Sequence, residues 1–150
     1  MSERNVQRIT DVDQVISILK GTSIFRQVGK DDLKALLKTA IQRTAPAGTK
    51  IVEEGKEGIG FYLIIAGTAE VSKHGSKLAT LKTGNFFGEL SCIDGAARTA
   101  DVIAASDVTC LVIPQWEMNN ALESSPGVAQ SMFRELVRRL RASNATLDTL

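Results

Sequence analysis

The stretch FFGELSCIDGAARTA at residues 86–100 determines how this 150-residue chain is interpreted. Gly88 has no Cβ, so a ligand can approach the backbone there closely. The carboxylate of Glu89 can accept hydrogen bonds from sugar hydroxyls. Nine residues further on, Arg98 presents a planar fork of donors that suits phosphate oxygens. A sugar acceptor and a phosphate donor in one short segment indicate a nucleotide site.

Three more residues of the stretch can contribute to the same site. Leu90 and Ser91 are expected to open a single helical turn, whose unpaired N–H groups favour an anion. Thr99 adds a hydroxyl beside the arginine. The alternative is a surface ion pair between Glu89 and Arg98 that closes a loop, worth about 0–1 kcal/mol. That alternative gives no reason for an acid, an anion-binding turn and an arginine to converge.

The number of positive charges indicates which nucleotide would fit. A single guanidinium can balance the single negative charge of a cyclic phosphodiester. A triphosphate site usually has a P-loop of the form GxxxxGK[ST] and a Mg²⁺ ion, and the chain contains no such motif. The sequence therefore favours a cyclic monophosphate.

Hydrophobic periodicity predicts an α+β chain that is mainly β, organised as one domain over residues 1–150. N-terminal helices are expected over 12–42, with Asp31 as the N-cap of the second helix and Thr10 or Asp11 as that of the first. An antiparallel β-roll or jelly roll is expected over 46–113. The final helices are expected over 114–148, the longer beginning with Ser125 as N-cap and a proline as first helical residue. The predicted strands are 49–53, 61–65, 68–73, 77–81, 102–104 and 108–113.

With these residues in view, the sequence resembles the cyclic nucleotide-binding domain family, which includes the sensor domain of catabolite activators and the regulatory subunits of protein kinase A. The resemblance is carried by two segments, Phe-Gly-Glu-Leu at 87–90 and Arg98-Thr99-Ala100. It extends from about Ile16 to Leu147. It implies that residues 86–100 form a phosphate-binding cassette between a β-roll and a long C-terminal helix.

The resemblance also implies residues that hold the base. Val71 and Leu78 match family positions that pack on the purine, and core packing is the alternative for both. Ser143 and Asn144 match residues that reach the purine amino group from the last helix, with a solvated helix surface as the alternative. Thr99 occurs in family members with either preference. We expect cAMP as the ligand, with cGMP as the alternative.

Composition excludes several other classes. The net charge of +1 gives no field that would attract nucleic acid or an anionic membrane. The sequence has no stretch of 18 apolar residues and opens with no charged-then-apolar leader, so a cytoplasmic protein is expected. Cys92 and Cys110 are interpreted as buried hydrophobes. His74, at a predicted hairpin tip, is the single histidine. Neither enzymatic chemistry nor a metal or other cofactor is therefore expected.

The resemblance further implies a non-enzymatic sensor whose last helix shifts when ligand binds. Its partner would be a second copy or an effector domain, either attached or separate. The chain ends at Leu150 without a helix-turn-helix pattern, so direct DNA binding is not expected. The alternative is an interaction or scaffold domain that retains the fold and binds no nucleotide. The residues predicted to form a dimer contact are Met132, Leu136, Leu140 and Leu147.

Overall fold

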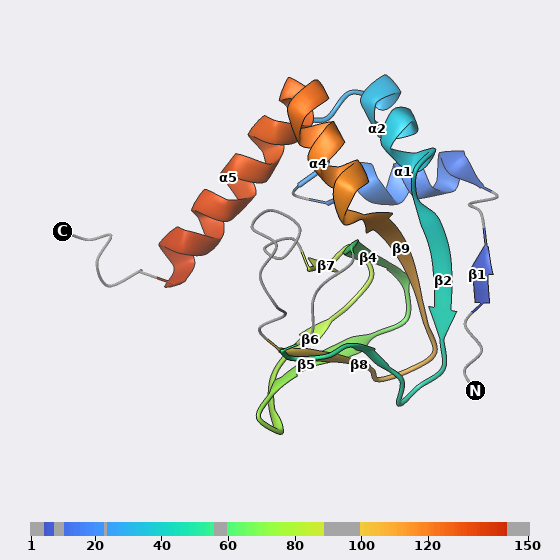
Figure 1. Cartoon of the computed structure of the whole chain (residues 1–150), viewed down its shortest axis with the longest axis vertical. Coiled ribbons are helices and arrows are strands. Elements are labelled where there is room, and N and C mark those ends of the chain that lie inside the picture. Colours follow the sequence, from blue (N-terminus) through green and yellow to red (C-terminus); the bar gives the residue numbers. More distant parts are fainter. Residues whose placement is uncertain (1–4, 8–10, 23, 56–59, 89–99, 144–150) are drawn as a thin grey trace.

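The computed structural model describes residues 5–7, 11–22, 24–55, 60–88 and 100–143. Within these residues, nine strands and four helices are arranged as a β-roll with helices on both sides of it in the sequence (Figure 1). The strands are β1 Asn5–Gln7, β2 Ile41–Ala45, β3 Lys50–Val52, β4 Gly60–Ala66, β5 Ala69–Lys73, β6 Ser76–Leu81, β7 Phe86–Phe87, β8 Asp101–Ala104 and β9 Val108–Pro114.

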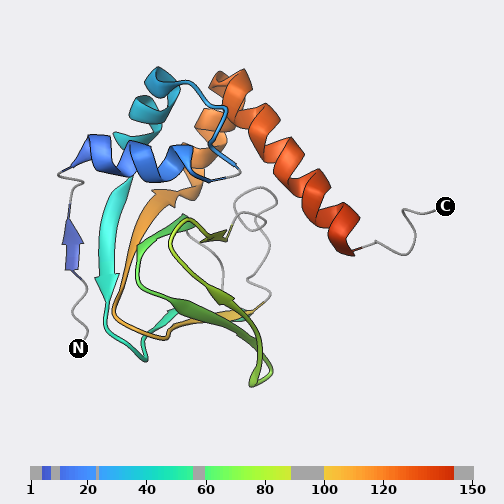
Figure 2. The same cartoon turned by 180° about the vertical axis from the view of Figure 1, so that it is seen from behind.

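The helices gather at one end of the roll. Figures 1 and 2 show α1, α2 and α4 together there, while α5 runs outward from them. The four described helices are α1 Val12–Lys20, α2 Lys30–Leu37, α4 Gln115–Ser124 and α5 Pro126–Ser143. No described helix combines the length and apolarity that would be needed to cross a membrane.

The described strands form two antiparallel sheets. One has the order β1-β2-β9-β4-β7 and the other the order β3-β8-β5-β6. The long strand β4 lies between β9 and β7 and shows how the layers are built. Phe61 and Leu63 face a core shared with the helices, whereas Tyr62 and Ile64 face a core shared with the second sheet. This alternation follows from the two-residue period of a strand. The expected fold class, a mainly β antiparallel roll flanked by helices, is confirmed.

Within residues 12–42, the structure differs from the prediction in one element. Residues 12–42 were expected to be helical, but α2 ends at Leu37, and Ile41–Ala45 forms strand β2. This strand pairs along its whole length with β9, from Ile41 opposite Val112 to Ala45 opposite Val108. The sheet hydrogen bonds thus decide the conformation of Ile41, which fits the helical spacing equally well.

The helix starts were predicted with mixed success. Asp11 is the N-cap of α1, and its carboxylate accepts a hydrogen bond from the Gln14 amide at 3.0 Å. Asp31 is not the N-cap of α2, because Gly29 occupies that position and Asp31 lies in the first turn. An acidic group there still interacts favourably with the helix dipole. Ser125 accepts a hydrogen bond from the Val128 amide at 3.3 Å, as an N-cap hydroxyl does.

Candidate functional site

The described residues define both ends of the predicted cassette. Within the cassette, the structure describes residues 86–88 at the upstream end and Ala100 at the downstream end. Six predicted site residues lie outside the described part of the chain: Glu89, Leu90, Ser91, Arg98, Thr99 and Asn144.

The upstream end is fixed by two aromatic pairs. Strand β7 lies antiparallel to β4, with Phe87 opposite Tyr62 and Phe86 opposite Leu63. The rings of Phe87 and Tyr62 stack at a centroid distance of 4.8 Å, with 8° between their planes. On the other face, Phe86 stacks on Phe61 at 5.4 Å. Phe86 and Phe87 are each 7% exposed, so both cores hold the strand that leads into the cassette.

The turn before β7 adds backbone hydrogen bonds to β4. The amide of Gly84 donates to the Ile64 carbonyl at 2.8 Å, and the Ile64 amide donates to the Asn85 carbonyl at 2.9 Å. The side chain of Asn85 also accepts from the Lys82 amide at 2.8 Å. The chain therefore reaches the cassette in one defined path.

Gly88 itself has a backbone φ of +88°. Side chains with a Cβ rarely adopt this left-handed region, which costs them about 1–2 kcal/mol. The structure thus supplies a conformational reason for glycine at this position. It stands beside the predicted reason, which is close approach of a ligand.

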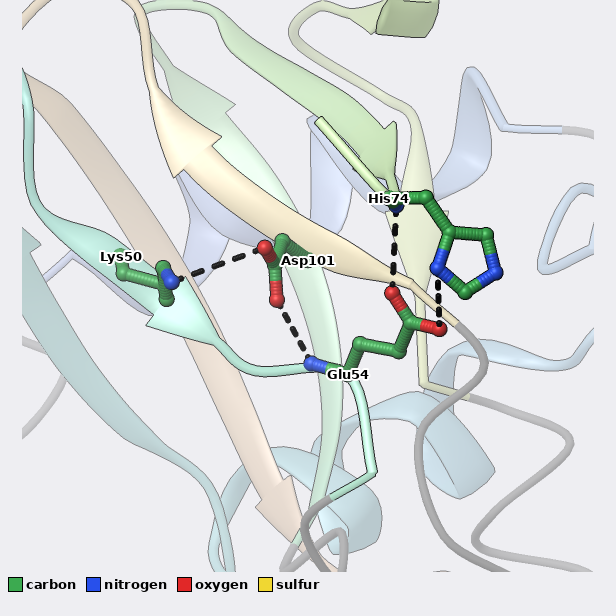
Figure 3. A network of polar contacts seen from close by, with 4 residues as sticks. All are labelled: Lys50, Glu54, His74 and Asp101. Atoms are coloured by element: carbon green, nitrogen blue, oxygen red, sulfur yellow. Dashed lines mark hydrogen bonds and ion pairs between the residues drawn. The ribbon is translucent and has the colours of Figure 1, made fainter. Parts of the chain in front are cut away.

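The downstream end is held by polar contacts (Figure 3). Asp101, the first residue of β8, directly follows Ala100. Its carboxylate accepts a hydrogen bond from the Glu54 amide at 2.7 Å and pairs with the Lys50 ammonium at 3.6 Å. These contacts tie the end of the cassette to β3 and to the residues that follow it.

The same network reaches the hairpin between β5 and β6. Figure 3 shows the Glu54 side chain directed at His74, whose amide donates to a carboxylate oxygen at 3.4 Å and whose Nδ1 lies 3.7 Å from the other oxygen. His74 has a φ of +53° and its side chain is 77% exposed. It therefore lies at the hairpin tip, as predicted, and its main contact is with a loop beside the cassette.

The two residues predicted to contact the base lie on this hairpin but in different surroundings. Val71 of β5 is half-buried and packs against the core between the sheets. Leu78 of β6 is 60% exposed. The pairing register shifts here, because Val71 lies opposite Ala79 and Ser72 opposite Lys77. Leu78 is thus the extra residue of a bulge, an irregularity that redirects a side chain.

Helix α5 buries one of the residues predicted to form a dimer contact and exposes another, Leu140. Met132 is 2% exposed and belongs to the core, and Leu136 packs against that core. Met132 is therefore unavailable for the dimer contact predicted from the sequence, and Leu136 is only partly exposed. The exposed apolar residues of α5 are Phe133 at 67%, Val137 at 47% and Leu140 at 60%. Ser143 is the last residue of the helix, and Leu147 lies outside the described residues.

A cavity of about 350 Å³ lies between α5 and the turn that precedes β7. Its lining residues are Gly21, Thr22, Leu81, Thr83, Gly84, Asn85, Phe86, Glu135 and Arg138.

Glu135, the acidic residue of this cavity, was not predicted as a site residue. Glu135 is 3% exposed, and its carboxylate accepts two hydrogen bonds from the Arg138 guanidinium, one of them 3.1 Å long from Nε. These hydrogen bonds and the negative charge of Glu135 raise the pKa of Arg138 above its ordinary value. The i, i+3 spacing of opposite charges was the signal available in the sequence.

Cys110 is buried in the core between the sheets, as predicted for a small hydrophobe. Burial raises the pKa of its thiol to about 12, and the nearby Arg43 opposes this only in part. Such a thiol stays protonated and unreactive at neutral pH. Among the described residues, no group of three or more histidine, cysteine or acidic side chains is positioned to hold a metal ion.

Comparison with known proteins identifies the family of the segment that contains the predicted cassette. The model of the cyclic nucleotide-binding domain matches residues 42–125, which include the whole predicted cassette. A cAMP-dependent protein kinase regulatory subunit of Candida albicans is 24% identical over 140 residues, covering 93% of this chain and 30% of that protein. The cyclic AMP receptor protein of Thermus thermophilus is 28% identical over 137 residues, covering 88% and 63% respectively.

Solved structures agree in fold. The catabolite activator protein of Thermus thermophilus superposes with a TM-score of 0.77 at 28% identity, over 85% of this chain and 62% of that one. The regulatory domain of Toxoplasma gondii PKA, solved with cAMP, superposes with a TM-score of 0.73 at 22% identity, over 87% and 53%. This chain therefore corresponds to only part of these proteins.

Proposed function

This chain belongs to the cyclic nucleotide-binding domain family, and we propose that it is a non-enzymatic sensor whose preferred ligand is cAMP. The observation that carries the proposal is the match over residues 42–125, in which the motif retains both Glu89 and Arg98. A scaffold domain that binds no nucleotide would have no need of either charge.

The proposed site divides the ligand among the cassette residues. Arg98 binds the cyclic phosphate through its guanidinium, and Glu89 accepts hydrogen bonds from the ribose hydroxyl. Gly88 lets the sugar-phosphate approach the backbone. The remaining cassette contributors are Leu90 and Ser91, through amides of a helical turn, Thr99, through its hydroxyl, and Ala100, which leaves room beside the phosphate.

The surrounding frame supports this assignment. Stacking of Phe86 and Phe87 on β4 holds the start of the cassette, and the Asp101 contacts with β3 hold its end. Because both ends are held, little of the binding free energy is needed to order the frame.

The base would lie against the hairpin of β5 and β6. Leu78 offers an exposed apolar surface there, on a strand at the edge of its sheet whose first five residues are all exposed. Val71 contributes from the neighbouring strand. Ser143 and Asn144 would reach the purine amino group, a contact that favours cAMP over cGMP.

Ligand binding would be transmitted through helix α5. Its start is attached to the helical layer, because the Ser125 hydroxyl donates to the Asp32 carboxylate at 3.0 Å. About two and a half turns further along the helix, Arg134 donates to the Gln27 side chain at 3.0 Å. The second half carries Val137 and Leu140, two of the three exposed apolar residues of the helix. A helix attached at one end and uncovered at the other can close over a bound base.

That exposed face also supplies the contact for a partner. We propose that Phe133, Val137 and Leu140 pack against a second copy or an effector domain. Amide hydrogen exchange of α5 with and without cAMP tests the transmission step. We expect increased protection of residues 137–143 on binding, and unchanged exchange there would contradict it.

Ligand identity is tested by competition. The chain is loaded with a fluorescent cAMP analogue and titrated with cAMP, cGMP, 5′-AMP and ATP. We expect cAMP to displace the analogue at the lowest concentration, cGMP at a higher one, and the two nucleotides that carry more than one negative charge only weakly. Failure of the analogue to bind at all would favour the scaffold alternative.

A further inference from the structure

A larger cavity, of about 620 Å³, lies among helix α1, the end of α2 and the start of β2. Its lining residues are Val12, Lys34, Leu37, Lys38, Thr39, Ala40 and Ile41. This volume is within the range of small-molecule sites, about 300–1,000 Å³. None of these residues belongs to the proposed nucleotide site.

The floor of this cavity is apolar. Leu37 and Ala40 are 5% and 6% exposed and belong to the core beneath the helices. Val12 and Ile41 are large apolar residues that remain 38% and 36% exposed. Ile41 is held in place by pairing with Val112 in the sheet. An apolar surface in a preformed concave site gains free energy when an apolar group covers it.

The rim of the cavity is positively charged. Lys34 and Lys38 are four residues apart at the end of α2, so they lie on the same side of the helix. Both are exposed, and none of the described residues that line the cavity is acidic. Within the described part of the chain, neither ammonium takes part in an ion pair. Like charges at this spacing repel each other, and an anion bound between them would remove that repulsion.

We propose that this cavity is a second binding site, which takes a small amphipathic anion with a carboxylate group and an apolar body. The apolar body lies on Val12, Leu37, Ala40 and Ile41, and the carboxylate lies between the two ammonium groups. The lysines also complement the negative end of the α2 dipole. The lysines could thus bind a carboxylate or only stabilise the end of α2. Comparing a ligand that has the carboxylate with one that lacks it separates these two roles. The proposal does not depend on the nucleotide site.

The test uses octanoate as the probe, with 1-octanol and octylammonium as matched ligands of the same chain length. Titration of the ¹⁵N-labelled 150-residue chain is followed by NMR. We expect octanoate to shift the amide signals of Thr39, Ala40 and Ile41 in a saturable way. Octanol should bind on the order of tenfold more weakly, because it loses two ion pairs. Octylammonium should be weaker still, because its charge is repelled.

The matched variants are the double substitution Lys34→Gln/Lys38→Gln and the control Lys30→Gln. Lys30 is exposed on the same helix but does not line the cavity. The double variant should bind octanoate about tenfold more weakly and octanol unchanged, whereas the control should bind both as the native chain does. The proposal is overturned if octanol binds as tightly as octanoate, or if no saturable shift occurs at these amides. Because the octanol comparison uses the unaltered chain, the test does not rely on the variants folding.

Discussion

Replacing Gly88 by alanine tests how the cassette begins. The φ of +88° places Gly88 in the left-handed region. Alanine there costs about 1–2 kcal/mol of backbone strain. Part of this is offset, because alanine restricts the unfolded chain by about 0.4–1 kcal/mol. The net loss in the free energy of unfolding should therefore be about 1 kcal/mol.

Gly48 provides a matched control. It has a φ of +90°, and a Cβ added there meets nothing within 4 Å. Its amide donates to the Ala104 carbonyl, a hydrogen bond that alanine retains. Gly48→Ala should therefore lose about the same stability as Gly88→Ala. Only the Gly88 variant should lose cAMP affinity, by about tenfold or more, since strain and the new methyl group both act where the ligand is expected.

Urea unfolding gives the stabilities, and titration calorimetry with cAMP gives the affinities. The reasoning is refuted if Gly88→Ala binds cAMP as tightly as Gly48→Ala does. It is also refuted if Gly88→Ala unfolds at the same urea concentration as the native chain, because the strain argument would then be wrong.

Further predictions concern two residues of the frame, Ser125 and Cys110, and one residue of the base site, Leu78. Ser125→Ala should lower the free energy of unfolding by about 1–2 kcal/mol, since it removes the N-cap of α5 and the part-buried hydrogen bond to Asp32. The exposed Ser124→Ala should cost less than about 0.5 kcal/mol in the same urea assay, and equal losses would contradict this. Cys110 should resist iodoacetamide at pH 8 in the folded chain and react in urea, as followed by peptide mass spectrometry, and rapid native labelling would show that the thiol is not buried. The Cys110 thiol has a pKa of about 12 in the folded chain, against an ordinary value of 9.0. Its contribution to the free energy of unfolding should therefore be lost as the pH rises from 9 to 12. A free energy of unfolding that stays constant over this pH range would contradict this. Leu78→Ser should weaken cAMP binding about threefold to tenfold with little change in stability, because Leu78 is exposed. The control Thr80→Ser should change neither the affinity nor the stability. Unaltered cAMP affinity in the Leu78 variant would show that Leu78 does not belong to the base site.

The sequence pattern predicted the β-roll because its strands carry apolar residues on one or both faces between glycine turns. The segment 61–65 is the clearest case, since both faces of β4 are buried. Strand β2 was missed because Ile41 fits a helical period, and its actual conformation depends on β9, about 70 residues away in the sequence. Local periodicity does not contain such long-range pairing.

The candidate site was predicted by spacing and family resemblance, which identify residue types but not the contacts that hold them. The aromatic stacking of Phe87 on Tyr62 was not predicted, because cross-strand register decides it. The hydrogen bond between Asp32 and Ser125 joins residues 93 positions apart, and no local signal marks it. The orientation of α5 was predicted incorrectly at Met132, because an amphipathic stripe does not show which of its residues the core will take.

The central claim is that one guanidinium in the cassette binds the cyclic phosphate. It is tested most directly by calorimetric titration of cAMP into Arg98→Ala, with Arg26→Ala as a control that removes the same charge from an exposed position outside the cassette. We expect the Arg98 variant to lose about 2–5 kcal/mol of binding free energy and the control to bind as the native chain does. Equal cAMP affinity in the native chain and in Arg98→Ala would contradict the account.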